Sequence, residues 1–255
     1  MNSLSIEAYK LIKDSKNIIV VTGAGISVSS GIPDFRSPES GLYATIGKKY
    51  DLTRPEDVFD INFFRKEPRL FYEVISTILA KEVKPTPTHK FIKMLQDKKK
   101  LLRNYTQNID GLERKVGIDD SLLVEAHGSF NDAQCTNYHQ QDVDRLIENI
   151  QNRKITKCTE CSAYVKPTIT FFGQALPERY EQLIQNDLKK CDLLIIIGTS
   201  LKVKPIGNIP ALLPYETPKI VINLENCVHN LKDGDVLILG DCDSETVAIS
   251  NLLNE

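Results

Sequence analysis

The fold of this chain is decided by one stretch, VVTGAGISVSSGIPDFR at residues 20–36. The aliphatic run NIIVVT at residues 17–22 predicts a strand buried on both faces, because strands of parallel sheets read as nearly continuous apolar runs. Gly23 and Gly25 would let the backbone approach a ligand where a Cβ would collide. The N–H groups of the following helix start, around residues 26–29, favour an anion. The stretch therefore predicts a phosphate-binding turn.

Taken alone, this glycine turn is a weak signal. The third position of the G-x-G-x-x-G pattern is Val28, and no acid follows about twenty residues later to hold a ribose. The stretch can therefore also be interpreted as a tight turn that binds no ligand. The next segment, GIPDFR at residues 31–36, adds an acid, an aromatic ring and a guanidinium group, which a purely structural loop does not need.

The composition is that of an ordinary globular protein. The 255 residues, 41% hydrophobic and 26% charged, suit one large domain or two lobes. A net charge of −2 gives no bulk attraction to phosphates, so we expect no direct nucleic-acid binding. The apolar run at residues 193–197 is too short to cross a membrane, and residues 1–13 read as a helix of the fold without a leader peptide. We therefore expect an intracellular protein without membrane contact.

The segments after the glycine turn differ in pattern. Residues 37–50 contain Pro38, Gly41 and Gly47 and predict an irregular, mobile cover. Residues 55–82 are helical, with Asn62 as a possible cap and an interruption at Pro68. Residues 86–95 predict another helix with Thr86 as its cap, and we interpret His89 in its first turn as structural.

Five further apolar runs alternate with helical patterns, which is typical of a parallel, doubly wound sheet. Each run ends in polar or small residues, and ligands of such sheets bind beyond the carboxyl ends of the strands. Six strand ends would therefore converge on one crevice, although turns are polar in any case. The runs lie at residues 101–105, 122–125, 193–197, 219–222 and 236–239.

The segment between residues 130 and 166 breaks this alternation and carries a metal-ligand pattern. Cys135 and His139 are followed, after eighteen intervening residues, by Cys158 and Cys161. Two ligand pairs at this spacing predict a tetrahedral zinc site, with a helix over residues 142–152 between them. If His139 does not reach the metal, the site is three-coordinate or empty.

Several longer motifs occur in order along the chain, namely GAGIS at 23–27, IPDFRS at 32–37, TQNIDGLER at 106–114, EAHGSF at 125–130, KPTITFFGQ at 166–174 and GTSL at 198–201. Together they closely resemble the sirtuin family of NAD-dependent protein deacylases. The resemblance implies an α/β fold, with a Rossmann-like doubly wound parallel sheet and a smaller lobe made of a helical module and a zinc-binding module. The implied single catalytic domain is 1–255, with the Rossmann-like lobe at 1–36, 86–128 and 168–255, the helical module at 37–85 and the zinc module at 129–167.

The resemblance also implies the residues that bind NAD. One group lies along the dinucleotide, a second lines the nicotinamide pocket, and a third holds the adenosine end. Asn223 and Glu225 offer a ribose contact from a late strand, in place of the missing acid. The implied contacts are Gly23, Ala24, Gly25, Ser27, Asp34, Phe35, Arg36, Gln107, Asn108, Ile109, Asp110, Gly198, Thr199, Ser200, Asn223, Glu225 and Cys242.

By the same resemblance, the catalytic residues are His127, Asn108 and Asp110. In sirtuins the acyl oxygen attacks the nicotinamide ribose carbon of NAD, nicotinamide leaves, and a histidine takes a proton from a ribose hydroxyl. His127 would be that base, because an imidazole with a pKa near about 6.5 accepts a proton at neutral pH. Asn108 would position the ribose and a water, Asp110 would hold the carboxamide, and Phe35 would shield the reacting carbon from water. The alternative is a histidine that only terminates a strand.

The implied activity is the transfer of acetyl groups from protein lysines, with histone tails among the candidate partners, to ADP-ribose. We expect the acyl-lysine beside Val165, Thr170, Phe171 and Phe172, where an extended peptide can pair with strand edges. The chain departs from relatives at three positions. Gln174 replaces an acid, His139 replaces a cysteine, and Ile46 stands where succinyl-preferring sirtuins carry an arginine. NAD-dependent ADP-ribosyl transfer and a catalytically silent NAD-sensing module remain as alternatives.

Overall fold

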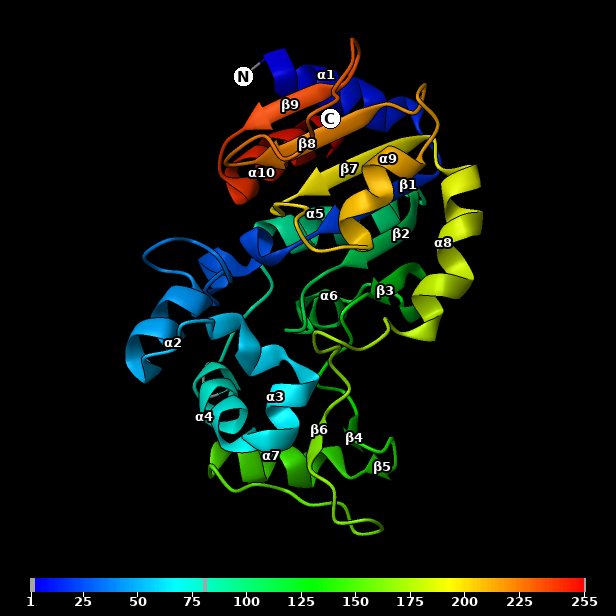
Figure 1. The fold of residues 1–255 in the computed structure, drawn as a ribbon. Helices are drawn as coiled ribbons and strands as arrows, with labels where there is room; N and C mark the ends of the chain where they lie inside the picture. Colours follow the sequence, from blue (N-terminus) through cyan, green and yellow to red (C-terminus); the bar gives the residue numbers. More distant parts are fainter. Residues whose placement is uncertain (1–2, 80–81, 255) are drawn as a thin grey trace.

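The computed structural model describes residues 3–79 and 82–254 (Figure 1). Three expected segments, 1–13, 55–82 and 1–255, include some of the residues 1–2, 80–81 and 255. In those places the expectations lie outside the described residues.

A parallel sheet forms the centre of the large lobe (Figure 1). Its strands are β1 (Ile18–Thr22), β2 (Leu101–Thr106), β3 (Leu123–Glu125), β7 (Leu193–Ile197), β8 (Lys219–Asn223) and β9 (Val236–Leu239). Within the described residues this sheet has six strands in the order β3-β2-β1-β7-β8-β9, and every neighbouring pair is parallel. The predicted α/β, doubly wound sheet is confirmed.

Helices cover both faces of this sheet, because the side chains of β1 alternate between two cores. Ile18 and Val20 pack into one core with α1, α5 and α10, whereas Ile19 and Val21 pack into the other with α8 and α9. This burial on both faces explains the continuous aliphatic sequence of the strand. The helices are α1 (Ser3–Asp14), α5 (Pro87–Asp97), α10 (Cys242–Asn254), α8 (Glu178–Lys190) and α9 (Ile209–Leu212).

The strand order reverses between β1 and β7, and this is the point where open α/β sheets bind ligands. The two loops that leave these strands touch each other. The Gly25 N–H donates to the carbonyl oxygen of Gly198 at 2.8 Å, and a Cβ on Gly25 would come within 2.7 Å of the Gly198 Cα. The glycine at position 25 is therefore required by contact with a neighbouring loop, whereas the sequence alone suggests contact with a ligand.

The small lobe is a second, three-stranded antiparallel sheet with helices packed around it, at the bottom of Figure 1. Aromatic rings fill its core, and Phe171 lies 4.9 Å from Phe71 and 5.3 Å from Phe64 between ring centroids. The elements are β4 (Ala133–Cys135), β5 (Gln140–Gln141), β6 (Val165–Pro167), α2 (Leu42–Tyr50), α3 (Ile61–Lys66), α4 (Pro68–Leu79) and α7 (Val143–Gln151).

Three local predictions were wrong or incomplete. Residues 42–50 form helix α2, because Leu42 and Ile46 are buried in the small-lobe core and outweigh the glycine at position 47. Asp60, and not Asn62, caps α3, because its carboxylate accepts from the N–H groups of Asn62 and Phe63. The helix after the glycine turn is a 3-10 helix, η1 (Ala24–Ser30).

The remaining elements are short. They are α6 (Leu112–Lys115), η2 (Pro55–Phe59), η3 (Asp120–Leu122) and η4 (Ile206–Asn208). No helix in the described part of the chain has the length and apolarity needed to span a bilayer.

Candidate active site and metal site

His127 follows strand β3, and its ring is fixed by one hydrogen bond. Its Nδ1 lies 2.9 Å from the main-chain carbonyl oxygen of Gln107. A carbonyl only accepts, so Nδ1 carries the hydrogen and Nε2 presents a lone pair. Nε2 is buried and has no partner among the described residues. Burial lowers the pKa of His127 below 6.5, although the bond to Gln107 opposes this shift. The imidazole is therefore a neutral base with its accepting atom free.

Asn108 and Asp110, which follow β2, are joined to the glycine turn through Ser27. The Asn108 amide donates to the Ser27 Oγ and to the Gly23 carbonyl oxygen, each at 3.2 Å. The Ser27 hydroxyl donates to Asp110 at 2.7 Å. The Leu112 N–H, at the start of α6, donates to the other carboxylate oxygen at 3.0 Å. These bonds bring the ends of β1 and β2 to one place, as the sequence predicted.

The ends of β7 and β8 close the same crevice. The Thr199 hydroxyl donates to the Gln107 side-chain oxygen at 2.6 Å, and the Asn223 amide donates to the Thr199 carbonyl oxygen at 3.2 Å. Ser200 follows in the same loop, and Cys242 is buried at the start of α10. Glu225 is exposed beyond β8, with its carbonyl oxygen 2.9 Å from the Asn223 amide.

Asp34, Phe35 and Arg36 lie in the loop between η1 and α2. Burial raises the pKa of Asp34, but hydrogen bonds from Ser37 and the Arg36 N–H outweigh it and lower the pKa overall. Phe35 packs against Tyr43 and Phe59 at 5.6 and 5.9 Å between ring centroids. Asp34 therefore fixes the loop, while the Phe35 ring anchors it on the small lobe. Ala24 and Ile109 are half-buried.

The segment expected to receive the substrate crosses from β6 to the large lobe. The Thr170 N–H donates to the His127 carbonyl oxygen at 2.7 Å, which ties this segment to the histidine. Val165 and Phe171 are 0% and 1% exposed, so their side chains support the segment from within the core. Phe172 is 39% exposed and Thr170 is half-buried, and these two face outward.

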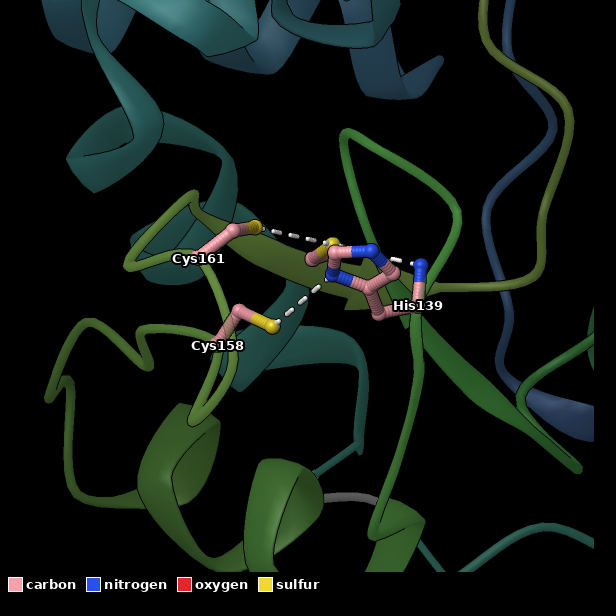
Figure 2. Close-up of side chains that lie close together, drawn as sticks. His139, Cys158 and Cys161 are labelled. Carbon is pink, nitrogen blue, oxygen red and sulfur yellow. Dashed lines mark hydrogen bonds between the residues drawn. The ribbon is translucent and has the colours of Figure 1, made fainter.

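The four predicted zinc ligands converge in the small lobe (Figure 2). The hairpin of β4 and β5 brings Cys135 next to His139, and the loop before β6 supplies Cys158 and Cys161. The sulfur atoms of Cys135 and Cys161 lie 3.8 Å apart, and the Cys158 sulfur lies 3.6 Å from His139 Nδ1.

These separations fit a zinc ion. A disulfide would bring two sulfurs to about 2.05 Å. Tetrahedral zinc with Zn–S bonds of about 2.3 Å and Zn–N bonds of about 2.0 Å places two sulfurs about 3.8 Å apart, and a sulfur and a nitrogen about 3.5 Å apart. His139 does reach the cluster, so all four positions of the tetrahedron have a donor. The site is closed and lies in the small lobe, apart from the crevice at the β1 and β7 ends (Figure 1).

The crevice also fits NAD. Buried polar atoms without a partner among the described residues point to a missing ligand, and here they include His127 Nε2 and Gln107 Nε2. Both belong to loops at the carboxyl ends of the central strands, where dinucleotides bind this sheet order.

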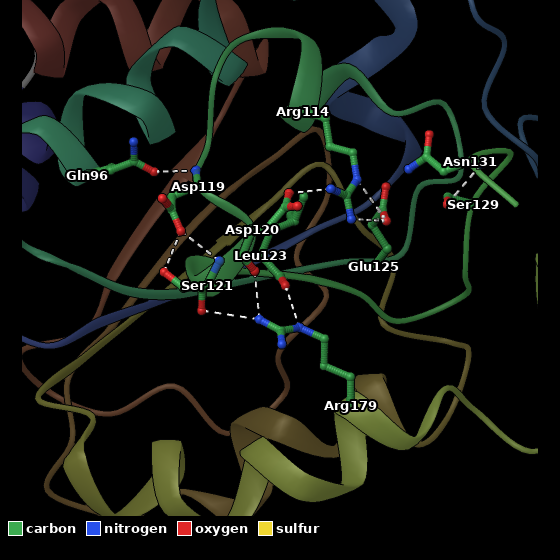
Figure 3. Close-up of polar contacts among 10 residues, drawn as sticks. All are labelled: Gln96, Arg114, Asp119, Asp120, Ser121, Leu123, Glu125, Ser129, Asn131 and Arg179. Atoms are coloured by element: carbon green, nitrogen blue, oxygen red, sulfur yellow. Dashed lines mark hydrogen bonds and ion pairs between the residues drawn. The ribbon is translucent and has the colours of Figure 1, made fainter.

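A cavity of about 910 Å³ lies on the outer side of β3, beyond the loop at Gly128. Both arginines that line it already have partners (Figure 3). Arg114 binds Asp120 and Glu125, and Arg179 donates to three main-chain carbonyl oxygens, including that of Leu123. Because both arginines of this cavity are already bonded, we assign the chemistry to the crevice and not to this cavity.

Sequence reasoning missed two residues beside Asp110. His89 on α5 and Glu113 on α6 are 0% and 1% exposed, and they form a cluster with Asp110. Glu113 lies within the motif at residues 106–114, but the charged Arg114 and Lys115 follow it, so no local pattern distinguishes it from an exposed helix position.

Comparison with known proteins agrees with this geometry. The family model described as "Sir2 family" matches residues 23–205. The chain is 46% identical to the NAD-dependent deacetylase sir2D of Dictyostelium discoideum, over 96% of this chain and 45% of that protein. It is 42% identical to the NAD-dependent protein deacetylase hst2 of Schizosaccharomyces pombe, over 95% of this chain and 74% of that protein. It is 44% identical to the NAD-dependent protein deacetylase sirtuin-1 of Homo sapiens, over 93% of this chain and 32% of that protein. The chain thus spans less than half the length of two of these relatives.

Proposed function

Because this chain belongs to the Sir2 family, we propose that it is an NAD-dependent protein lysine deacetylase. Two relatives, 46% and 42% identical, are named an NAD-dependent deacetylase and an NAD-dependent protein deacetylase. The product would be the free lysine, with the acetyl group moved to ADP-ribose and nicotinamide released.

One observation supports this function above the others, namely the neutral, partner-free Nε2 of His127. When bound, NAD supplies the ribose carbon that takes the acyl oxygen as nicotinamide leaves. His127 Nε2 would accept the proton of a ribose hydroxyl, and the bond from Nδ1 to Gln107 would keep the imidazole in the accepting tautomer. A silent NAD-binding module has no need of a free base at this position.

Asn108 and Asp110 would orient the bound NAD. The Asn108 amide is held by Ser27 and Gly23, so its carbonyl oxygen is left to position a ribose hydroxyl or a water. Asp110 would accept from the nicotinamide carboxamide, because a carboxylate has about four acceptor positions and Ser27 and Leu112 use two of them. The loop with Phe35 would cover the reacting carbon and exclude water.

We propose that the acyl-lysine enters between the lobes, beside Thr170 and Phe172. The lobes would follow the expected boundaries, with the helical module at 37–85 and the zinc module at 129–167, and the separate aromatic core of the small lobe supports this division. Zinc would hold the β4–β5 hairpin and the loop before β6 together, without a part in the chemistry.

The partners would be acetylated proteins, with histone tails as one candidate, since a relative from Drosophila melanogaster is named an NAD-dependent histone deacetylase. With such substrates, the protein would act in the nucleus or cytoplasm.

The test is nicotinamide release from NAD with and without an acetylated peptide. A deacetylase releases nicotinamide only with the acetylated peptide, and forms one free lysine for each nicotinamide. Release with the unmodified protein and labelling of that protein by ADP-ribose would favour ADP-ribosyl transfer. NAD binding without any release would indicate a sensing module.

A further inference from the structure

A lysine is buried in the small lobe at the start of the proposed substrate segment. Lys166, on β6, is 1% exposed, and no carboxylate forms an ion pair with it in the described part of the chain. Burying an ammonium group without a counter-ion costs free energy, and an apolar side chain would fill the same space without that cost. Packing alone therefore does not explain a lysine at this position.

Three neutral contacts take the place of a carboxylate. The Lys166 Nζ donates to the main-chain carbonyl oxygen of Ile169 at 2.6 Å and to that of Pro167 at 3.0 Å. It also lies 4.7 Å from the centre of the Phe171 ring. An ammonium has three donors, so two carbonyls and one aromatic face use all of them. Burial lowers the pKa of Lys166 to about 8, which leaves the group mostly charged at pH 7.

The bond to Ile169 fixes a peptide group that also contacts the loop of the proposed base. The carbonyl of Ile169 and the N–H of Thr170 belong to one planar trans peptide, so they point in opposite directions. On one side Lys166 holds the carbonyl oxygen, and on the other side the Thr170 N–H donates to the His127 carbonyl oxygen at 2.7 Å. This peptide plane is therefore held from both sides, by a small-lobe ammonium and by the main chain of His127.

The carbonyl group of Thr170 is open to a ligand. Among the described residues, no donor is bonded to this oxygen. An extended peptide adds to an exposed strand edge through main-chain hydrogen bonds, for which such a carbonyl is an acceptor. Only two dihedral angles, φ and ψ of Thr170, separate the carbonyl from the peptide plane before it. Holding that plane therefore narrows the directions in which the Thr170 carbonyl can point.

We propose that Lys166 is a positioning residue for the substrate segment, because its ammonium fixes the peptide group between Ile169 and Thr170 and so directs the Thr170 carbonyl oxygen toward the main chain of the acyl-lysine substrate. The inference rests on the proposed function, since it takes residues 170 and 172 as the edge where the substrate docks. Lys166 itself is buried and does not touch the substrate. It acts only through the main chain of residues 167–169.

The test replaces Lys166 by methionine, which keeps an unbranched apolar stem but removes the charge and the donors. We expect the KM for an acetylated peptide to rise at least about tenfold, because hydrogen bonds to charged groups are among the stronger ones. The affinity for that peptide, measured by calorimetry, should fall by the same factor. The KM for NAD and kcat should stay near those of the wild type, because Gln107 holds the His127 ring separately.

Lys219→Met is the matched control. Lys219 is 6% exposed at the start of β8, at the end of the strand opposite the crevice, and its Nζ donates to the Thr217 carbonyl oxygen at 3.2 Å. The same chemical change at this second buried lysine should leave both KM values unchanged. Equal effects of the two substitutions on the peptide KM would contradict a specific role of Lys166.

Amide hydrogen exchange tests the inference without any turnover. In Lys166→Met we expect faster exchange in residues 168–172, including the Thr170 amide, while α4 and α7 in the same lobe keep the wild-type rates. A purely structural role would instead lower the melting temperature and speed exchange throughout the small lobe, because loss of stability opens the whole cooperative unit. Local exchange together with a changed peptide KM is therefore the signature of positioning.

Two outcomes would overturn the proposal. The first is an unchanged peptide KM in folded Lys166→Met, and the second is an increase of exchange that spreads evenly over the small lobe. If Lys166→Met does not fold, Lys166→Gln takes its place, because its side-chain amide ends one atom short of the ammonium and does not reach both carbonyls. Peptide binding with the expected local exchange but no turnover of acetyl-lysine by the wild type would leave this inference standing and refute the deacetylase function.

Discussion

The Nδ1 atom of His127 lies 2.9 Å from the main-chain carbonyl oxygen of Gln107, which directly precedes Asn108. The end of β2 therefore sets the tautomer of a histidine that follows β3. Since the two strands are hydrogen-bonded neighbours, the base and the proposed ribose-binding amide are both held by this strand pair.

Replacing His127 should abolish most of the deacetylation but leave NAD binding intact. We expect His127→Ala to lower deacetylation at least about a hundredfold, the usual scale for a general base, with NAD affinity and melting temperature near those of the wild type. Turnover of an acetylated peptide under saturating NAD measures this. Near-normal turnover in the folded variant would remove His127 from the mechanism.

The pH profile should report the lowered pKa of His127. Because burial holds this pKa below its ordinary value, the ring is mostly neutral at pH 6.5, and protonation at lower pH removes the base. We expect the acid limb of kcat/KM to have its midpoint below pH 6.5. A midpoint above pH 6.5 would contradict a buried, neutral His127 ring in the free enzyme.

Zinc content should depend on His139. We expect one zinc per wild-type chain, a clear loss in His139→Ala, and recovery in His139→Cys, since a thiolate is an equally good zinc ligand. Metal analysis with thermal unfolding measures this, and chelation should unfold the small lobe. Full zinc in His139→Ala would show that His139 is not a ligand. Active, folded protein without any zinc would refute the site itself.

Acetyl-lysine should be a far better substrate than succinyl-lysine. Tyr43 and Ile46 lie on α2, and Ile46 is 3% exposed. By the resemblance, they occupy the positions of the tyrosine and arginine that succinyl-preferring sirtuins carry. An unpaired carboxylate in an apolar channel costs several kcal/mol, and each 1.4 kcal/mol is about tenfold in rate. Lys48 and Lys49 are exposed at the end of α2. Equal kcat/KM on acetylated and succinylated forms of one peptide would show that one of these lysines supplies the charge.

Stability should fall in acid because of His89. Its folded pKa is about 4, and its unfolded value is near 6.5, so the unfolded chain takes up the proton first. The stabilisation is complete above pH 6.5 and is lost as the pH falls through 4, which amounts to about 2 kcal/mol between pH 7 and 5. Urea unfolding at both pH values should show a smaller loss for His89→Gln than for the wild type. An equal loss would mean that His89 is already charged in the folded state.

Much of the fold could be read from local sequence. The apolar runs predicted the strands of the large sheet, because a strand buried on both faces requires continuous aliphatic residues. Thr86 and Pro87 predicted the start of α5. Local reading failed at α2, where tertiary burial of Leu42 and Ile46 decided the conformation, and at the cap of α3.

By itself the sequence determined the donor set of the zinc site, the motifs of the crevice and the histidine that ends β3, because side-chain chemistry and short spacings are local properties. Only the tertiary structure decided the strand order, the contact of Gly25 with Gly198, the reach of His139 and the meeting of His89, Asp110 and Glu113. These features join residues far apart in the chain. Their hydrogen-bond partners and burial, and therefore their tautomers and pKa values, exist only after the separate elements have packed together.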